Sequence, residues 1–388
     1  MFRDMLKYAA VIMAAVLVMS VAVYLDKHPA HPESRDGSGI QSETALSNTL
    51  STEAWETGVW ETEAWERSDW EMTEPATQPE ETTIPEETEA DNRFLLTFAG
   101  DCTLGSNPVN RFALYGFENT VADNYRYPFA NVIGYFESDD FTMVNLEGTL
   151  GDKGTAAIKN HVFRGSAEYV NILTENSVEA VTLANNHSMD YGPKGYEATK
   201  QILEDGDVPY VEDGVTQIFT TENGLTIGVY ATVYYNLNVD HMVTGIKELK
   251  DQGVDLIIFA AHWGAEGYYK PNEIQMNAGH AAIDAGAQIV YGCHPHVLQP
   301  IEEYNGGIIY YSLGNFSFGG NLYPEDYDTA LVQQEVIRNA DGTVSLGELT
   351  VVPCRLSSVT DHNNFQPTPY AEDTEDYARV MKKLGLDS

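Results

Sequence analysis

The sequence predicts a layered α/β domain, preceded by one membrane-spanning helix and an acidic linker. Two observations predict the domain. Short apolar runs alternate with helical patterns between residues 93 and 357, and most of these runs stop at residues that bind metals or carry protons. Strands that alternate with helices are typical of α/β folds, and about 265 residues are enough for a substantial core.

The first 25 residues predict a signal-anchor. Residues 8–25 form an uncharged run of 18 residues, which is about the minimum length for a membrane-spanning helix. Arg3 and Lys7 precede this run, so the positive-inside rule places the N-terminus in the cytoplasm and the rest of the chain outside the cell. No clear cleavage site follows the run, which favours an anchor over a cleaved signal peptide. We therefore expect a single-pass protein of the cell membrane.

Residues 26–92 predict a disordered acidic linker, because they hold 18 acidic side chains against three basic ones and few large aliphatic ones. Trp55, Trp60, Trp65 and Trp70 recur every five residues, a period that fits neither a helix face nor a strand face. The repeat is interpreted as part of an extended spacer, with aromatic anchors for wall polymer or a partner as the alternative. The net charge of −38 excludes charge-driven binding of nucleic acid.

Three short apolar runs open the domain, and each stops at polar residues. Runs of this length, rich in β-branched and aromatic residues, predict strands rather than helices. The expected strands are Leu95–Ala99, which ends at Gly100-Asp101; Phe141–Asn145, which ends at Leu146-Glu147; and Val178–Ala184, which ends at Asn185-Asn186-His187. A helix is expected over Lys194–Glu204.

The second half of the domain repeats the alternation. Further strands are expected at Leu225–Thr232, at Asp255–Ala261 before His262, at Ala287–Tyr291 before His294, and at Ile308–Ser312 before Asn315. The intervening helices are expected at Met242–Gln252 and Glu273–Ala285. Residues 358–388 predict a polar C-terminal tail with a short amphipathic helix at Glu375–Leu384.

The segment His294-Pro295-His296 is the strongest single signal of a site. Pro295 fixes one φ angle and removes one backbone donor, so the loop that carries the two imidazoles is stiff. Such a pair suits a metal ion. Two loop histidines that face water are the alternative for an isolated pair.

The other strand ends supply further ligands of the same kind. Carboxylate, amide and imidazole groups follow five separate apolar runs: Asp101, Glu147, Asn186 with His187, His262, and His294 with His296. Strand ends at one edge of a sheet converge, and this mixed set of ligands suits one or two divalent ions such as Mn, Fe or Zn. The alternatives are a turn at Asp101, a cap at Asn185 and Asn186, and a buried structural His262.

Six motifs in this order resemble the CapA family, the capsule-synthesis proteins linked to poly-γ-glutamate, itself similar to a divergent branch of the calcineurin-like metallophosphoesterases. They are Gly100-Asp101, Asn145-Leu146-Glu147, the run from Leu183 to Gly192, His262-Trp263-Gly264, the run from Gly292 to Val297, and the run from Tyr311 to Phe316. The resemblance covers residues 93–357 and implies a layered α/β sandwich of the metallophosphoesterase type.

The resemblance also implies a role for each residue. Asp101 and His296 would bind a first metal, Glu147 would bridge, and Asn186, His262 and His294 would bind a second. His187 would approach the substrate as general acid or oxyanion stabiliser. The chain departs from the phosphoesterase pattern at Thr103, where a histidine is usual, so the first metal site is one imidazole poorer.

Three more residues are candidates for contact with substrate. Arg164 lies in a family-like stretch and would hold an anionic substrate, with a surface salt bridge as the alternative. Glu266 follows His262-Trp263-Gly264, and Asn315 would support the metal loop or only shape a turn.

The resemblance implies a membrane-anchored, metal-dependent hydrolase that acts in synthesis or export of a capsule polymer, using a metal-activated water. Its substrate would be capsule polymer or another phosphorylated or anionic compound, and its partners would be membrane-embedded capsule synthase components. A non-catalytic assembly factor that keeps the fold is one alternative. Amidase activity on γ-glutamyl or wall peptide bonds is another.

Overall fold

The computed structural model describes residues 92–386. The predicted anchor at residues 1–25 and nearly all of the predicted linker lie outside the described residues. Within the part of the chain that is described, no helix is both long and apolar enough to cross a bilayer.

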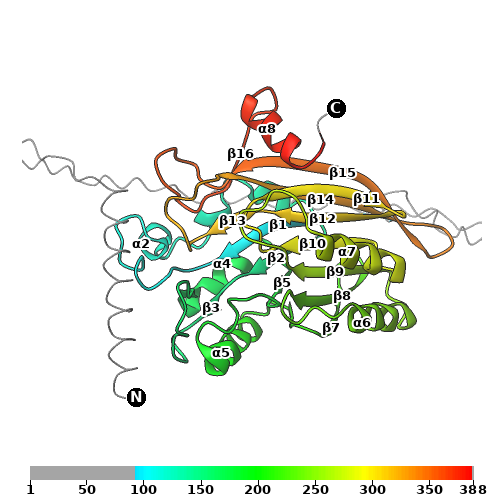
Figure 1. Cartoon of the computed structure of the whole chain (residues 1–388), viewed down its shortest axis with the longest axis horizontal. Coiled ribbons are helices and arrows are strands. Elements are labelled where there is room, and N and C mark those ends of the chain that lie inside the picture. The colour runs from blue at the N-terminus through cyan, green and yellow to red at the C-terminus, as the bar shows by residue number, and fades with distance from the viewer. Residues whose placement is uncertain (1–91, 387–388) are drawn as a thin grey trace, which may run out of the picture. The chain divides into compact units, whose positions relative to one another are not determined.

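Two β-sheets form the centre of the domain (Figure 1). The larger sheet has the strand order β16-β15-β14-β1-β2-β5-β6, with β13 also paired to β1. Its strands are β16 (Thr368–Pro369), β15 (Val344–Arg355), β14 (Asp328–Arg338), β1 (Arg93–Thr103), β2 (Phe141–Leu146), β5 (Ala180–Thr182), β6 (Tyr210–Val211) and β13 (Asn315–Phe318).

The second sheet has six strands in the order β11-β12-β10-β9-β8-β7. They are β11 (Leu298–Tyr304), β12 (Gly307–Leu313), β10 (Ile289–Cys293), β9 (Leu256–His262), β8 (Thr226–Val233) and β7 (Thr216–Thr220). A two-stranded sheet, β3 (Thr149–Leu150) with β4 (Arg164–Gly165), lies apart from both.

The main apolar core lies between the two large sheets. Phe98 and Met143 of the larger sheet belong to the same buried cluster as Ile258 and Tyr310 of the smaller one. The central strands of both sheets are buried along their whole length, as expected for parallel strands covered on both faces.

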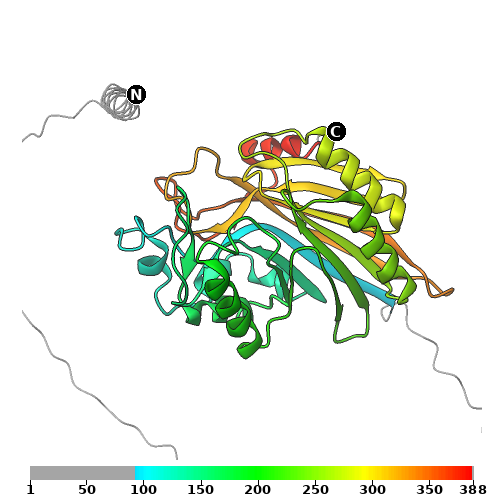
Figure 2. The same cartoon turned by 60° about the horizontal axis from the view of Figure 1, so that its bottom comes forward.

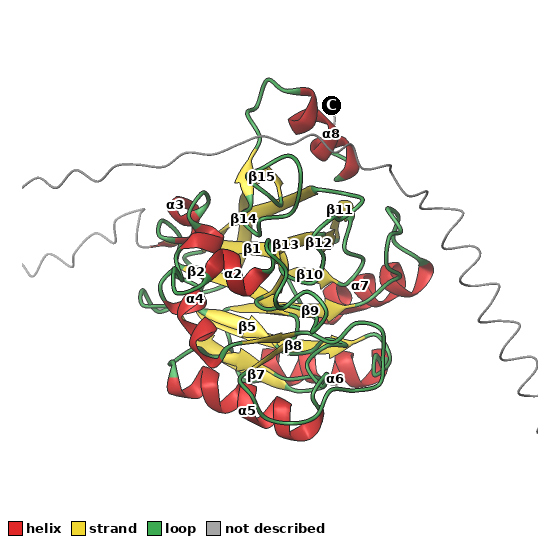
Figure 3. Cartoon of the chain, turned by 90° about the vertical axis from the view of Figure 1, so that its left-hand side faces the viewer, coloured by secondary structure: helices red, strands yellow, loops and turns green. Residues whose placement is uncertain are grey.

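Helices cover the outer faces, so that strands occupy the middle of the domain and helices its outside (Figure 3). Helices α6 (Val239–Asp251) and α7 (Glu273–Ala285) lie side by side against the smaller sheet (Figures 1 and 2). The remaining helices are α2 (Phe117–Val121), α3 (Ile133–Phe136), α4 (Val170–Thr174), α5 (Gly192–Asp205) and two short 3-10 helices, Tyr127–Phe129 and Ala167–Tyr169.

The chain ends in helix α8 (Glu375–Lys383), which begins one residue after its N-cap Thr374. Val380 and Leu384 of this segment pack against Leu298 and Ala330 from the two sheets. Lys383 and Arg379 both bind the buried carboxylate of Asp328. The polar tail predicted from the sequence therefore packs against the two sheets and forms ion pairs with β14.

The mixed α/β architecture that the sequence predicts is confirmed, and every strand and helix predicted between residues 93 and 386 has a counterpart in the structure. Strands β1, β2 and β5 are parallel neighbours, and so are β8, β9 and β10. Their carboxyl ends deliver the predicted polar residues to one edge of the sandwich.

Candidate metal centre

Glu147 occupies the middle of the cluster formed at this edge. It follows β2, is fully buried, and neither of its carboxylate oxygens has a hydrogen-bond donor. The Nε2 atoms of His187, His262 and His296 lie 3.7, 3.8 and 3.8 Å from its Oε1. A buried carboxylate without a donor is rare in folded proteins, because its desolvation is costly.

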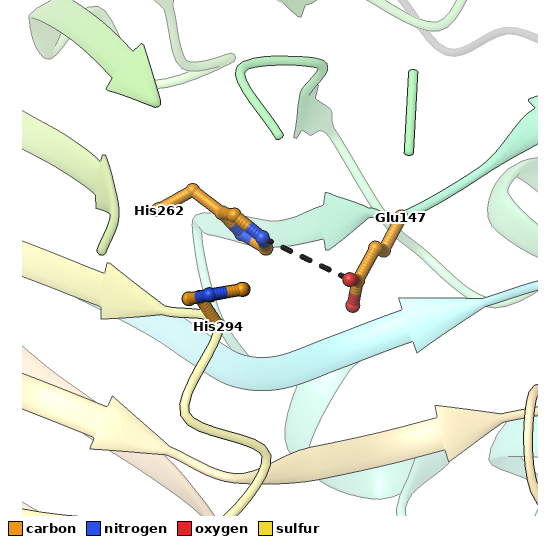
Figure 4. Close-up of side chains that lie close together, drawn as sticks. All are labelled: Glu147, His262 and His294. Carbon is orange, nitrogen blue, oxygen red and sulfur yellow. Dashed lines mark ion pairs between the residues drawn. The ribbon is translucent and has the colours of Figure 1, made fainter. Parts of the chain in front are cut away.

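The donors around Glu147 form two groups that share its carboxylate. Glu147, His262 and His294 offer ligand atoms within 4.8 Å of one another, and so do Asp101, Glu147 and His296. Figure 4 shows the first group, with the His262 and His294 rings and the Glu147 carboxylate around one space. This set of donors would suit one or two divalent ions, with the Glu147 carboxylate available to both groups.

The surroundings of Glu147 favour a cation. Burial raises the pKa of Glu147 well above its usual value, although His296 acts in the opposite direction. Burial likewise lowers the pKa of His262 far below its usual value and that of His294 to about 4, so both rings are neutral at pH 7. Neutral imidazoles are the form that binds metals.

Asp101 lies in β1, where Gly100 allows the backbone to approach the loop after β12. A Cβ on Gly100 would lie 2.1 Å from the carbonyl oxygen of Gly314. The buried Asp101 carboxylate accepts hydrogen bonds from Asn145 Nδ2 at 2.8 Å and from the backbone N–H of His294 at 3.2 Å. Burial alone would raise the pKa of Asp101, but His296 outweighs it and holds that pKa below the usual value.

His296 is oriented by Asn315, the first residue of β13. The His296 Nδ1–H lies 2.9 Å from Asn315 Oδ1 and 3.2 Å from Asp101 Oδ2, which leaves Nε2 facing Glu147. Burial alone would lower the pKa of His296, yet Glu147 and Asp101 raise it to about 10. Without a metal the ring therefore carries the positive charge that the carboxylates require.

The loop that carries His294 and His296 is held in an unusual backbone conformation. Their φ angles are 99° and 57°, in a region that residues with a Cβ seldom adopt. The His294 ring stacks on Tyr234 with a centroid distance of 5.0 Å, and its buried Nδ1 has no hydrogen-bond partner. Such strain persists where the surrounding structure enforces it and is concentrated at functional sites.

Asn186 and His187 follow β5 and reach the same space. Asn186 Oδ1 lies 2.8 Å from His262 Nε2. His187 Nδ1 lies 2.8 Å from Asp190 Oδ2, and the other oxygen of Asp190 is 2.5 Å from Lys159 Nζ. Because the Asp190 carboxylate accepts the Nδ1 proton, the Nε2 of His187 is directed toward Glu147.

The remaining predicted residues differ in their distance from the centre. Glu266 is exposed but shares a group of nearby ligand atoms with His294 and His296. The Arg164 guanidinium stacks 3.3 Å from the Tyr191 ring centroid and donates to the backbone of Lys153, so the structure places it beside the centre and not among the ligands.

Thr103 is buried two residues after Asp101, at the position where the phosphoesterase pattern would usually have a histidine. Its hydroxyl has no hydrogen-bond partner among the described residues. The group on the Asp101 side therefore has Asp101, Glu147 and His296 as its donors, whereas Asn186 adds to the His262 side.

Sequence reasoning missed three residues that build this centre. Asn145 donates to Asp101, while Asn185 donates to Asn145 Oδ1 at 3.1 Å and accepts the backbone N–H of His187. Asp190 orients His187. A signal was available for Asp190, which lies three residues after a histidine in a polar run. The amide network depends on contacts between strands, so spacing along the chain does not reveal it.

Solved structures with some likeness to the chain include a putative 5'-nucleotidase from Staphylococcus aureus, with a TM-score of 0.42 and 14% identity over 76% of this chain and 58% of that one. The NAD nucleotidase of Haemophilus influenzae gives a TM-score of 0.39 and 12% identity over 76% and 63% of the two chains.

Sequence comparison gives nearer relatives. The capsule biosynthesis protein CapA of Bacillus anthracis is 30% identical over 317 residues, which are 74% of this chain and 75% of that protein. The PGA biosynthesis protein CapA of Bacillus subtilis (strain 168) is 30% identical over 326 residues, 78% of this chain and 80% of that one. The family model described as "Bacterial capsule synthesis protein PGA_cap" matches residues 95–234 and 212–320. The chain therefore belongs to the CapA-type family of bacterial capsule synthesis proteins.

Proposed function

We propose that the chain is a metal-dependent hydrolase of the phosphoesterase type that acts in capsule biosynthesis. The observation that carries this proposal is the buried Glu147 carboxylate, which has no donor and is shared by two groups of ligand atoms. A divalent ion would satisfy both oxygens at once. The donor set of carboxylate, imidazole and amide suits Mn, Fe or Zn.

The residues that would hold metal are Asp101 and His296 on one side, Asn186, His262 and His294 on the other, and Glu147 between them. A divalent metal held there would supply a water nucleophile at neutral pH and would polarise a phosphoryl oxygen. Asn315 keeps His296 in the orientation that presents Nε2 to the centre.

His187 is the residue placed to move a proton. Asp190 and Lys159 fix its ring from the side away from Glu147, so a proton is exchanged at Nε2. A positioned acid or base of this kind contributes about 10²–10⁴-fold to a rate. Burial lowers the pKa of His187, which keeps Nε2 free to accept a proton at neutral pH.

We further propose that the domain works outside the cell, tethered by the predicted helix at residues 8–25, near membrane-embedded synthase components. The predicted substrate is capsule polymer or another phosphorylated or anionic compound. In an acidic chain, metal at the centre would provide the attraction for an anion.

The proposal is tested by measuring bound metal and hydrolysis of a generic phosphodiester with the full-length chain. Wild type should hold one or two equivalents of metal and be active. Glu147→Gln should lose metal and activity together, whereas His187→Gln should keep metal and lose at least about 100-fold in kcat. A metal-loaded wild type that is inert on phosphate esters contradicts the proposal.

Thr103 favours a second candidate, a non-catalytic assembly factor that keeps the metal-binding fold. With a threonine in place of an imidazole, the Asp101 side has only Asp101, Glu147 and His296 as donors, whereas the amide of Asn186 adds to the His262 side. This candidate predicts that Glu147→Gln leaves capsule production in cells intact, while deletion of residues 1–92 abolishes it.

A further inference from the structure

The loop between β9 and α7 brings one further carboxylate to the exposed edge of the metal centre. Glu266 lies in this loop, and its side chain is exposed. Its carboxylate offers a ligand atom within 4.8 Å of ligand atoms of both His294 and His296. Among the described residues, none donates a hydrogen bond to this carboxylate or forms an ion pair with it. Its charge is therefore free to meet a ligand from outside.

Backbone hydrogen bonds hold this loop against the loop that carries the two histidines. The Trp263 N–H donates to the carbonyl oxygen of Cys293 at 3.0 Å, and the Gly267 N–H donates to that of Pro295 at 2.8 Å. Gly267 has a φ angle of 75°, which glycine adopts without strain. Exposed glutamates are common in a chain with 59 acidic side chains, but Glu266 lies between two attachments to the histidine loop, so the fold sets its position.

The two sides of the centre differ in the number of donors that they offer. The His262 side has four donors, because the amide of Asn186 joins one carboxylate and two imidazoles. The Asp101 side has three, since Thr103 stands where a histidine would supply a fourth. The divalent ions that suit these donors take four or more ligands. The Asp101 side therefore has room for one more donor.

The distance between Glu266 and His296 suits two ligands of one ion. Ligands that each lie about 2.1 Å from an ion are at most about 4.2 Å from one another. Ligand atoms of Glu266 and His296 lie within 4.8 Å. Because the Glu266 side chain is exposed, a small rotation of it would close the remaining difference without any change in the core.

We infer that Glu266 is a fourth protein ligand on the Asp101 side, a carboxylate that compensates for the histidine absent at Thr103. An ion there would be held by Asp101 and Glu147 from the larger sheet and by the two loops that follow β9 and β10 of the smaller one. The inference rests on the metal centre of the proposed function, but it does not depend on hydrolysis.

The test is calorimetric titration of the metal-free, full-length chain with Mn²⁺. Glu266→Gln should weaken the binding of one ion at least about tenfold, because even groups that only support a ligand contribute about 10–100-fold to metal affinity. Glu266→Asp keeps the charge and should lose less. Glu248→Gln is the matched control, since Glu248 is exposed on α6 and belongs to none of the ligand groups, and it should bind Mn²⁺ as wild type does.

A second substitution identifies the side on which Glu266 acts. If Glu266 and His296 hold the same ion, their effects on affinity should not add in the double variant with His296→Ala, whereas additive effects would overturn the inference.

The outcomes separate this inference from the proposed function. Mn²⁺ binding by Glu266→Gln with the affinity of wild type would overturn the inference and leave the proposed function standing. A metal-loaded wild type that is inert on phosphate esters would overturn the proposed function and leave the inference standing. A wild type that binds no metal would overturn both.

Discussion

Glu147 shows how one residue can reverse its effect on stability when a ligand binds. In the metal-free protein its carboxylate is buried, has no donor, and has a pKa well above the usual value because of burial. The folded state therefore disfavours the ionised form, which is the form that the unfolded chain adopts at neutral pH. A bound cation would remove this disadvantage, so a single side chain couples metal affinity to folding.

This coupling predicts whether Glu147→Gln raises or lowers the stability of the metal-free protein. A group whose pKa is raised by folding stabilises the protein at low pH and loses that contribution as pH rises through the folded-state pKa. Metal-free Glu147→Gln should therefore be more stable than wild type at pH 8, by on the order of 1–3 kcal/mol.

Chemical denaturation in the presence of a chelator measures the effect, with the exposed Glu348→Gln as the control. Added metal should then stabilise wild type and have no effect on Glu147→Gln. A metal-free variant less stable than wild type at pH 8 would show that Glu147 is satisfied without a metal.

At the scale of elements, the sequence predicts the parts of the fold that repeat a local pattern. The strands before Asp101, Glu147 and His262 were predictable because each is a short apolar run that a polar ligand ends. The expected strand Val178–Ala184 is shorter in the structure, at Ala180–Thr182, because ladder partners exist only for its middle.

The antiparallel strands at the sandwich edge were harder to predict. Polar residues interrupt the apolar residues of β14 and β15, so neither strand contains a long apolar run. The sequence does contain one local signal of an antiparallel pair, at the turn between β11 and β12. Asn305-Gly306 joins β11 to β12 with positive φ at both residues, which is the preferred hairpin turn between two strands.

The opposite end of the strands holds a carboxylate that predicts a pH dependence of stability. Glu179, just before β5, accepts the backbone N–H of Thr142 at 2.6 Å, but burial raises its pKa to about 7 and nearby Asp139 adds to the shift. Its contribution to stability is therefore full below about pH 4.5 and lost as pH rises through about 7.

Glu179→Gln should remove this dependence, because the amide oxygen still accepts from Thr142 and carries no charge. At pH 8 the free energy of unfolding of the variant should exceed that of wild type by on the order of 1–2 kcal/mol. This figure allows for solvent screening, because water reaches part of the side chain. The measurement is thermal unfolding of both proteins at pH 5 and pH 8. If the substitution changed the Tm equally at both pH values, titration of Glu179 would be ruled out as the cause.

At the scale of the whole molecule, the centre joins two sheets that pack face to face. Asp101 lies in β1 and Glu147 follows β2 of the larger sheet, while His262 ends β9 and the two other histidines, His294 and His296, follow β10 of the smaller one. The histidine and carboxylate motifs could be recognised from the sequence, but this division between sheets could not, since it depends on how the halves of the chain pack.

That division predicts that metal stabilises the domain as one unit. An ion held by both sheets has no equivalent site in the unfolded chain, so at 100 times its Kd it adds about 2.7 kcal/mol to the free energy of unfolding. The described domain forms one compact unit, so we expect a single cooperative transition whose Tm rises with metal concentration. His294→Ala, which leaves the larger sheet's ligands intact, should reduce this rise, and Lys247→Ala should not. Metal that raised the Tm of only part of the domain, in two separate transitions, would mean that its ligands come from one sheet alone.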